Sequence, residues 1–348
     1  MTGSSATIDV SVVVPTRNRA HWLPDCIRSL VAQETSASVE FLIVDNASSD
    51  GTPGVIAEWT ARDPRVGGIR ELKLGRSAAL NAGMRIARGR LLLFTDDDVM
   101  ADPGWIASYV GLFARHPDAE LAGGAIFPIP KNLARPSWFS DRALVAIGSI
   151  EFAGERPLTE TENVWGANMA ARRDLFERIG TWGEELGVRG ENHPRNDRPE
   201  GNEDTELQMR LLAAGGAVWY CPGAVIRHRA DVPGPRGCVT KGFANGRNSV
   251  RRGAKPSAPH EPLRRPHSAA AGLLLTTAMV RMVLWCGILR IATTRPIFER
   301  AWGAAWSSGW RLENLLSSGE RDRTDLRILK IVWPVRQLAE RLAPARGG

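Results

Sequence analysis

Residues 10–33 read VSVVVPTRNRAHWLPDCIRSLVAQ, an apolar run that is followed by an amphipathic one. Four of the first five residues are valine and the run ends at Pro15, which predicts a buried strand. In the second part apolar side chains recur at helical spacing, at Trp22, Ile27, Leu30 and Val31. The stretch therefore predicts one strand followed by one helix.

The same alternation continues through the first 100 residues. Further strands are predicted at FLIVDN (41–46), GIRELKL (68–74) and RLLLFTDDDV (90–99), and helices at 52–61 and AALNAGMRIARG (78–89). Nearly continuous apolar strands that alternate with helices are typical of an α/β protein with a mostly parallel sheet flanked by helices.

Polar residues follow three of these predicted strands, at PTRNR (15–19), DNASSDG (45–51) and DDD (96–98). In parallel sheets ligands bind beyond the carboxyl ends of the strands, so these residues are expected to line a ligand site. Carboxylates there can hold Mg²⁺ or Mn²⁺ while phosphate and water complete the coordination. Because alternate strand residues share a face, Asp96 and Asp98 are expected to face the metal and Asp97 to point away.

Six segments, in their order and spacing, resemble glycosyltransferase family 2. They are VSVVVPTRNRAHWLPDCIRSL (10–30), FLIVDNASSDGT (41–52), GRSAALNAG (75–83), LLLFTDDDV (91–99), GANMAARRDLFERIGTWGEEL (166–186) and GNEDTELQMRLLAAGGAVWYCPGAVIRH (201–228). The resemblance covers residues 8–230 and implies the GT-A (Rossmann-like) fold. It also implies a metal-dependent, inverting transfer of sugar from a UDP-, GDP- or dTDP-sugar to an acceptor hydroxyl.

The resemblance also implies a donor site. Asp45 would accept hydrogen bonds from ribose hydroxyls or a pyrimidine N–H, while initiation of the DNASSDG turn is its alternative role. Arg76 could neutralise phosphate or be a surface arginine. Asn81 is expected to orient its loop more than to touch substrate. The complete donor set is Pro15, Thr16, Arg17, Arg19, Asp45, Asn46, Arg76, Asn81, Asp96 and Asp97.

The metal and the general base follow from the same resemblance. Asp96 and Asp98 occupy the family's DxD positions and His228 matches a frequent family histidine, so Mn²⁺ or Mg²⁺ is expected at these three residues, although a lone histidine is often structural. Asp204 is the predicted base, because an acceptor hydroxyl must lose its proton as it attacks; helix capping is the alternative. The acceptor side is expected at Gly166, Asn168, Met169 and Glu203.

One departure from the family narrows the reaction. Processive polymerases of this family carry a Q-x-x-R-W motif, whereas Gln208 and Arg210 lie in LQMRLL without the tryptophan. A single addition in glycan, glycolipid or glycosylated natural-product synthesis is therefore predicted. A nucleotidyltransferase is an alternative, but such enzymes usually have a Gly-rich first loop that carries Arg or Lys, and this sequence has no such loop. A non-catalytic nucleotide-sugar-binding or membrane-associated scaffold is another, and the intact Asp204 argues against it.

Charge is distributed unevenly along the chain. Residues 227–348 carry 22 Lys+Arg against 8 Asp+Glu, while the whole chain has a net charge of only +7. We predict a GT-A catalytic domain at 1–230, with a nucleotide-binding half (1–100) and an acceptor-side half (101–230). A basic loop or lid (231–268) and a C-terminal amphipathic helical region (269–348) follow.

The C-terminal region has features of a membrane surface helix. The apolar run 269–294 contains Arg281 and Arg290, and a central arginine costs a membrane span about 3 kcal/mol, so an interfacial helix is expected. Trp302, Trp306 and Trp310 follow on one helical face. The expected partners are an anionic membrane surface and a lipid-linked acceptor, with no nucleic acid. Packing on the catalytic core or on a second copy is the alternative.

Cysteine usage and the N-terminus bear on localisation. The four cysteines (Cys26, Cys221, Cys238, Cys286) show no paired spacing, which predicts neither disulfides nor a zinc cluster and fits a reducing compartment. The first apolar run has no basic residue before it and is expected to be a strand and not a signal peptide. We therefore expect a cytoplasmic protein, peripheral at the inner face of the cell membrane.

Overall fold

The computed structural model describes residues 8–129, 148–159, 162–184 and 203–229, together with Arg300, Gly303 and Ala304. The chain divides into two compact units, residues 1–131 with 149–229 and residues 132–148 with 230–348. Every helix and strand named below belongs to the first unit. The predicted lid (231–268), almost all of the predicted C-terminal helical region (269–348), and Cys238 and Cys286 lie outside the described residues.

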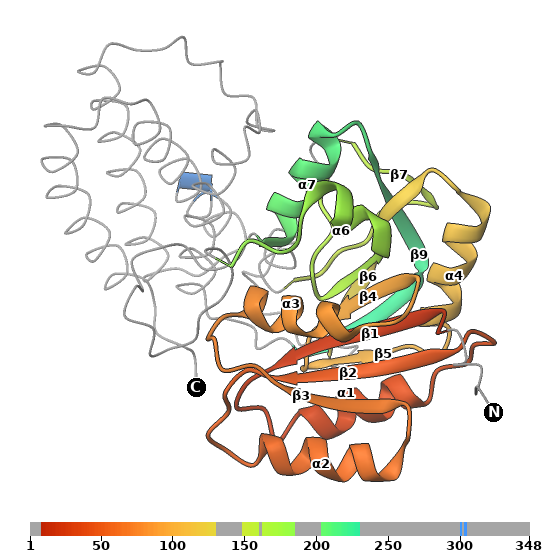
Figure 1. Cartoon of the computed structure of the whole chain (residues 1–348). Coiled ribbons are helices and arrows are strands. Elements are labelled where there is room, and N and C mark those ends of the chain that lie inside the picture. Colours follow the sequence, from red (N-terminus) through yellow and green to blue (C-terminus); the bar gives the residue numbers. More distant parts are fainter. Residues whose placement is uncertain are drawn as a thin grey trace, which may run out of the picture. The chain divides into compact units, whose positions relative to one another are not determined.

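Four strands from the first 95 residues form the parallel half of one sheet. β1 (Val10–Thr16) lies between β2 (Val39–Asp45) and β4 (Leu91–Thr95), and β3 (Val66–Arg70) extends the sheet beyond β2. β1 and β2 are buried along their whole length, which explains their continuous apolar sequence. Figure 1 shows α3 (Arg76–Ile86) on one face of this half and α1 (Leu23–Val31) and α2 (Thr52–Arg62) on the other.

The third strand and helix differ from their predicted bounds. The strand ends at Arg70 instead of continuing to residue 74, and the helix begins at Arg76, two residues earlier than expected. Gly75 accounts for the difference, because its φ of 134° is accessible to glycine alone and turns the chain directly into the helix. The amide oxygen of Asn46 fixes this turn by accepting a hydrogen bond from Gly75 N at 2.8 Å.

The second half of the sheet is mixed. β8 (Asn168–Arg172) pairs antiparallel with β4 and with β6 (Ala119–Ile129). β9 (Ala217–Arg229) pairs parallel with β6 and antiparallel with β5 (Val99–Ala101) and β7 (Arg156–Pro157). The strand order is β3-β2-β1-β4-β8-β6-β9-β5, with β7 beside β9. The prediction of parallel pairing is correct for the first half; β8 reverses direction because it starts beside Thr95, at the carboxyl end of β4.

One hydrophobic core extends across both halves of the sheet. Helices α4 (Trp105–Arg115), α6 (Arg173–Ile179) and α7 (Glu203–Ala213) complete its cover, and Phe94 of β4 packs edge-on against Phe176 and Trp182 with centroids 5.8 and 5.2 Å apart. The 1–100 and 101–230 halves therefore share one core within the described ranges. Cys26 and Cys221 are buried free thiols. Among the described residues, no helix has the length and apolar character needed to cross a bilayer.

Candidate active site

The carboxyl edge of the sheet gathers three acidic or imidazole side chains. Asp96 and Asp98 follow β4, and the antiparallel pairing of β5 with β9 places His228 opposite Val99. One ligand atom from each of Asp96, Asp98 and His228 lies within 4.8 Å of the others. The segment that links β4 to β5 and the end of β9 thus bring together residues that are 130 positions apart in the chain.

The chemistry of this cluster fits a divalent cation. Asp98 Oδ1 is buried and accepts no hydrogen bond from the part of the chain that the structure describes, although His228 Nε2 lies 3.2 Å away. A buried carboxylate oxygen without a donor is costly unless a cation compensates it. Carboxylate oxygen and imidazole nitrogen are both ligands of Mn²⁺. The predicted triad is therefore assembled in a form suited to a metal.

Arg76 joins this cluster to a second acid. Its Nη2 and Nε donate to Asp96 Oδ1 at 2.6 and 3.1 Å, and its Nη1 donates to Glu203 Oε1 at 2.7 Å. Burial alone would raise the pKa of Asp96, but the charge and hydrogen bonds of Arg76 outweigh it and lower that pKa. Arg76 is thus not a surface arginine, and two carboxylates of the protein already engage its guanidinium.

Asp97 contributes no atom to the metal cluster. Its carboxylate faces the other way, 3.5 Å from Arg19 Nε. Burial raises its pKa to about 7, against the smaller lowering effect of the neighbouring Thr16 hydroxyl. Asp97 therefore lies against the end of β1 and the loop after it, on the side of the site away from the metal cluster.

The loop after β1 lies beside the turn after β2. Arg19 N donates to Thr52 Oγ1 at 2.9 Å, and Asn18, at a φ of 54°, accepts from Ser49 N through its amide oxygen. Pro15 and Thr16 are buried in β1, while Arg17 is half-buried. These contacts present the backbone and the two arginines of the predicted donor loop at the carboxyl edge.

Asp45 fills one of the two roles that its sequence leaves open and keeps an oxygen available for the other. Oδ1 accepts the Ser48 amide at 3.0 Å and so initiates the turn after β2. Oδ2 is buried and accepts no hydrogen bond within the described ranges, with Arg70 Nε the nearest cation at 3.8 Å. One carboxylate oxygen thus holds the loop and the other remains available for a donor hydroxyl or N–H.

Two predicted donor residues hold loops with their side chains. The amide nitrogen of Asn46 donates to Glu71 O and Lys73 O, and its amide oxygen accepts from Gly75 N. Asn81 exchanges hydrogen bonds with the backbone of Trp182 and donates to Glu184 Oε1 at 2.9 Å. Asn81 therefore orients a loop, as its sequence context favours, and Asn46 has the same kind of role.

Two predicted acceptor-side residues belong to the core. The amide of Asn168 donates to Ala125 O and Ala224 O and accepts from Trp105 Nε1 and Tyr109 Oη, which uses all its hydrogen-bonding capacity. Asn168 and Met169 are fully buried. The prediction of acceptor contact is wrong for these two side chains, because β8 is an interior strand between β4 and β6.

Asp204 is the second residue of α7 and faces Gly166. Its Oδ2 accepts the Gly166 amide at 3.0 Å, and its Oδ1 accepts the Thr205 amide at 2.7 Å. Oδ1 also accepts the Thr205 hydroxyl at 3.4 Å, so Oδ2 is the oxygen that keeps a second lone pair for a substrate hydroxyl. Gln208 fixes this end of the helix by bonding both Val164 N and Val164 O. The structure thus gives Gln208 a local structural role at the start of α7.

Trp22 and Arg229 also lie at this edge, and the sequence did not single them out as site residues. The guanidinium carbon atoms of Arg19 and Arg229 lie 5.3 and 6.0 Å from the Trp22 ring centroid. Arg229 forms an ion pair with Asp25, and its amide donates to Asp98 O at 2.9 Å. For Arg229, the signal in the sequence was the basic RHR ending of β9 (227–229).

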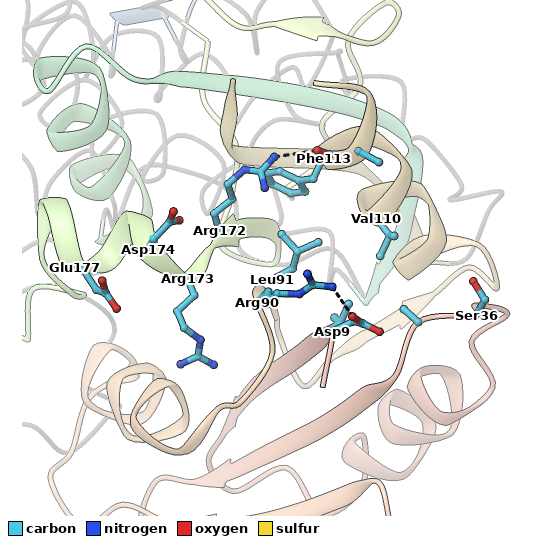
Figure 2. Close-up of a pocket in the computed structure, with 13 residues that line it drawn as sticks. Asp9, Ser36, Arg90, Leu91, Val110, Phe113, Arg172, Arg173, Asp174 and Glu177 are labelled. Atoms are coloured by element: carbon cyan, nitrogen blue, oxygen red, sulfur yellow. Dashed lines mark hydrogen bonds and ion pairs between the residues drawn. The ribbon is translucent and has the colours of Figure 1, made fainter. Parts of the chain in front are cut away.

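A pocket of about 740 Å³ lies at the opposite edge of the sheet (Figure 2). It is lined by the first residues of β1 and β4, where Arg90 pairs with Asp9 at 2.8 Å, and by Arg172, whose Nη2 donates to Phe113 O. None of the predicted site residues lines it. The candidate active site is therefore defined by its assembled side chains and not by this pocket.

The mixed sheet with functional groups at its carboxyl edge is similar to the sheets of GT-A glycosyltransferase structures. Residues 11–180 match the model described as Glycosyl transferase family 2, and this part of the chain belongs to that family. The fold resembles the structure of S. aureus TarS 1-349, with a TM-score of 0.50 and 14% identity over 91% of this chain and 93% of that one. It also resembles GalNAc-T7 with UDP, GalNAc and Mn²⁺, with a TM-score of 0.50 and 15% identity over 73% and 52% of the two chains.

Two curated relatives are enzymes of the same class. A glucosyl-dolichyl phosphate glucuronosyltransferase of Haloferax volcanii is 27% identical over 53% of this chain and 59% of its own length. A validoxylamine A glucosyltransferase of Streptomyces hygroscopicus subsp. jinggangensis is 26% identical over 62% of this chain and 54% of its own. The alignments thus span somewhat more than half the length of these relatives.

Proposed function

We propose that this protein transfers one sugar from a nucleoside-diphosphate-sugar to an acceptor hydroxyl, with inversion at the anomeric carbon and with Mn²⁺ or Mg²⁺ as cofactor. The observation that carries the proposal is the convergence of the Asp96, Asp98 and His228 cluster with Asp204 at one edge of the sheet, with Arg76 between them. A donor-binding region and a base are the two parts that such a transfer needs.

The donor is proposed to occupy the ends of β1 and β2. Asp45 Oδ2 would accept from the ribose or base, because it is a buried acceptor that accepts no hydrogen bond in the described part of the chain. Arg17 and Arg19 would face the diphosphate, where guanidinium groups bind phosphate oxygens well. Asp96, Asp98 and His228 would hold the cation, which when bound neutralises charge on the leaving diphosphate.

Asp204 is the proposed base. As the acceptor oxygen bonds to the anomeric carbon, the bond from that carbon to the diphosphate breaks and the hydroxyl proton passes to the Asp204 carboxylate. Attack from the side opposite to the leaving group inverts the configuration. The Gly166 and Thr205 amides hold this carboxylate in place while a lone pair stays available.

The test is a panel of UDP-, GDP- and dTDP-sugars with Mn²⁺ or Mg²⁺, scored for release of nucleoside diphosphate and repeated with a chelator. Mn²⁺ is included because the GalNAc-T7 structure contains it. Metal-dependent release that increases with an acceptor supports the proposal. Release of pyrophosphate would indicate a nucleotidyltransferase, and donor binding without consumption would indicate a scaffold.

A lipid-linked acceptor at the cytoplasmic face of an anionic membrane is the proposed setting. Residues 227–348 carry the excess of basic residues, and the name of the Haloferax relative includes a dolichyl phosphate. Flotation with anionic and with neutral liposomes, using the full chain and a chain that ends at residue 268, tests this setting. Equal flotation of both chains would assign the basic region to packing.

A further inference from the structure

We infer that Arg76 is a positioning residue that holds the metal-binding carboxylate of Asp96 and the base-bearing helix α7 in one fixed arrangement. The inference rests on the proposed function, since it concerns the two carboxylates that the reaction uses. Arg76 bonds Asp96 directly through Nε and Nη2, and it reaches the base through Nη1 on Glu203, the residue before Asp204.

Burial makes this link strong. The side chain of Arg76 is 14% exposed and that of Glu203 is 5% exposed, so water cannot replace their contact. Glu203 Oε2 accepts no hydrogen bond from the described residues, which leaves Arg76 as the group that compensates its charge. Removing one partner of a buried ion pair is strongly destabilising, because the other charge stays buried.

Two glycines shape the space that Arg76 occupies. Gly75 turns the chain so that Arg76 is the first residue of α3. At Gly166 a Cβ atom would lie 2.9 Å from Arg76 Nη1 and 3.0 Å from Nη2, so a larger residue would displace the guanidinium. The amide of Gly166 also donates to Asp204 Oδ2. Arg76 therefore packs against the same residue that orients the proposed base.

The planar fork of arginine is needed for this arrangement. Three separate N–H groups reach two carboxylates in different directions, whereas a lysine ammonium is a single point charge. Asp204 is also close enough for its charge to raise the pKa of Arg76, so all three acids favour the cationic guanidinium. Replacing Arg76 should disturb Asp96 and Asp204 together.

The inference is tested with Arg76→Gln, Arg76→Lys, Glu203→Gln and the double variant Arg76→Gln/Glu203→Gln. Arg88→Gln is the matched control, because Arg88 Nη2 pairs at 2.7 Å with the buried Glu40, and both lie at the opposite edge of the sheet. The measurements are Mn²⁺ affinity by calorimetry, the melting temperature, kcat and KM for the donor, and amide hydrogen exchange at Gly166 and Thr205.

Arg76→Gln should weaken Mn²⁺ binding and lower kcat by about 10- to 100-fold each, the usual loss when an outer partner of a metal ligand is removed. Amide hydrogen exchange at Gly166 and Thr205 should become faster. Arg76→Lys should recover part of the stability but little of kcat. Arg88→Gln should lower the melting temperature and leave Mn²⁺ affinity, kcat and both amides unchanged.

The double variant separates positioning from charge balance. Glu203→Gln added to Arg76→Gln should restore part of the melting temperature, since Asp96 still lacks its two bonds from Arg76, and it should restore neither Mn²⁺ affinity nor kcat. Recovery of kcat to the level of Glu203→Gln alone would overturn the inference and reduce Arg76 to neutralising Glu203. Unchanged exchange at Gly166 and Thr205 in Arg76→Gln would also overturn it, and this readout needs neither metal nor turnover. A wild-type chain that consumes no donor would instead defeat the proposed function.

Discussion

The two edges of the sheet use their acidic residues differently. At the amino edge, Glu40 Oε1 accepts from Ser11 Oγ and Arg88 N, and Oε2 accepts from Arg88 Nε. Asp9 accepts from Ser38 and Arg90 in the same way. At the carboxyl edge, by contrast, Asp45 Oδ2, Asp98 Oδ1 and Glu203 Oε2 are buried without a hydrogen-bond donor among the described residues.

This difference separates acids that stabilise the fold from acids that are held ready for a ligand. A buried carboxylate oxygen without a donor destabilises the protein, so its retention at one edge indicates a compensating function. Substitutions should therefore have opposite consequences at the two edges. Substitution of Asp98 or Asp204 at the carboxyl edge should reduce turnover with little loss of stability. Substitution of Asp9 or Glu40 at the amino edge should lower stability with little loss of turnover.

The largest loss of turnover is expected for Asp204→Asn. The asparagine oxygen can still accept one of the two amides that Asp204 accepts, so donor binding should stay near that of the wild type and the melting temperature should fall only slightly. Without a base, kcat should fall by about 10²- to 10⁴-fold. Nucleoside diphosphate release and donor calorimetry check this outcome together. Retained turnover would remove Asp204 from the mechanism.

A smaller loss, accompanied by an altered metal requirement, is expected for Asp98→Asn. Removing one of the ligating carboxylates should raise the Mn²⁺ concentration needed for half-maximal rate by at least about tenfold. The melting temperature without metal should change little, because Asp98 Oδ1 accepts no hydrogen bond in the described structure and an asparagine oxygen can keep the 3.2 Å contact with His228 Nε2. Asp9→Asn at the amino edge is the control, and it should lower the melting temperature while leaving the Mn²⁺ dependence unchanged. A fall in stability with unchanged Mn²⁺ dependence would contradict the assignment.

Asp97→Asn should affect turnover less than either change. Asp97 lies outside the cluster of ligand atoms and faces Arg19, so an isosteric amide keeps its shape while weakening one contact at 3.5 Å. We expect kcat to change less than about tenfold, with Mn²⁺ dependence unaltered. A loss equal to that of Asp98→Asn would show that all three acids of the run serve the metal.

Local sequence was sufficient to predict the first half of the fold and the positions of the acids. Continuous valine and leucine runs identify buried parallel strands, and a polar residue after each run marks the carboxyl edge. Asp45, Asp96 and Asp98 could therefore be assigned to that edge from their place in the sequence. The pairing of β5 with β9, which brings His228 to Asp98, depends on contacts across 130 residues that no local pattern encodes.

The sequence was less informative about what each polar side chain does. Asn46 and Asn168 resemble ligand-binding residues, but their amides bond loops and core groups of this protein. The link from Arg76 to Asp96 and Glu203 was also hidden, because a lone arginine after a glycine has many uses. Roles of this kind depend on which partners tertiary packing supplies, and spacing alone does not contain that information.

The smallest effect on turnover is expected for Glu40→Gln, which tests the amino edge. Burial raises the pKa of Glu40, but hydrogen bonds from Ser11 and Arg88 outweigh it, so the pKa is lowered on folding. A lowered pKa adds stability above the unfolded value, about 4.3 for glutamate, and this stability is lost as the pH falls through the folded value. The wild-type melting temperature should thus fall as the pH drops below about 5, and Glu40→Gln should flatten that dependence while costing about 1–3 kcal/mol at neutral pH. Its kcat should match that of the wild type. A reduced kcat at unchanged stability would show that the two edges are not functionally separate.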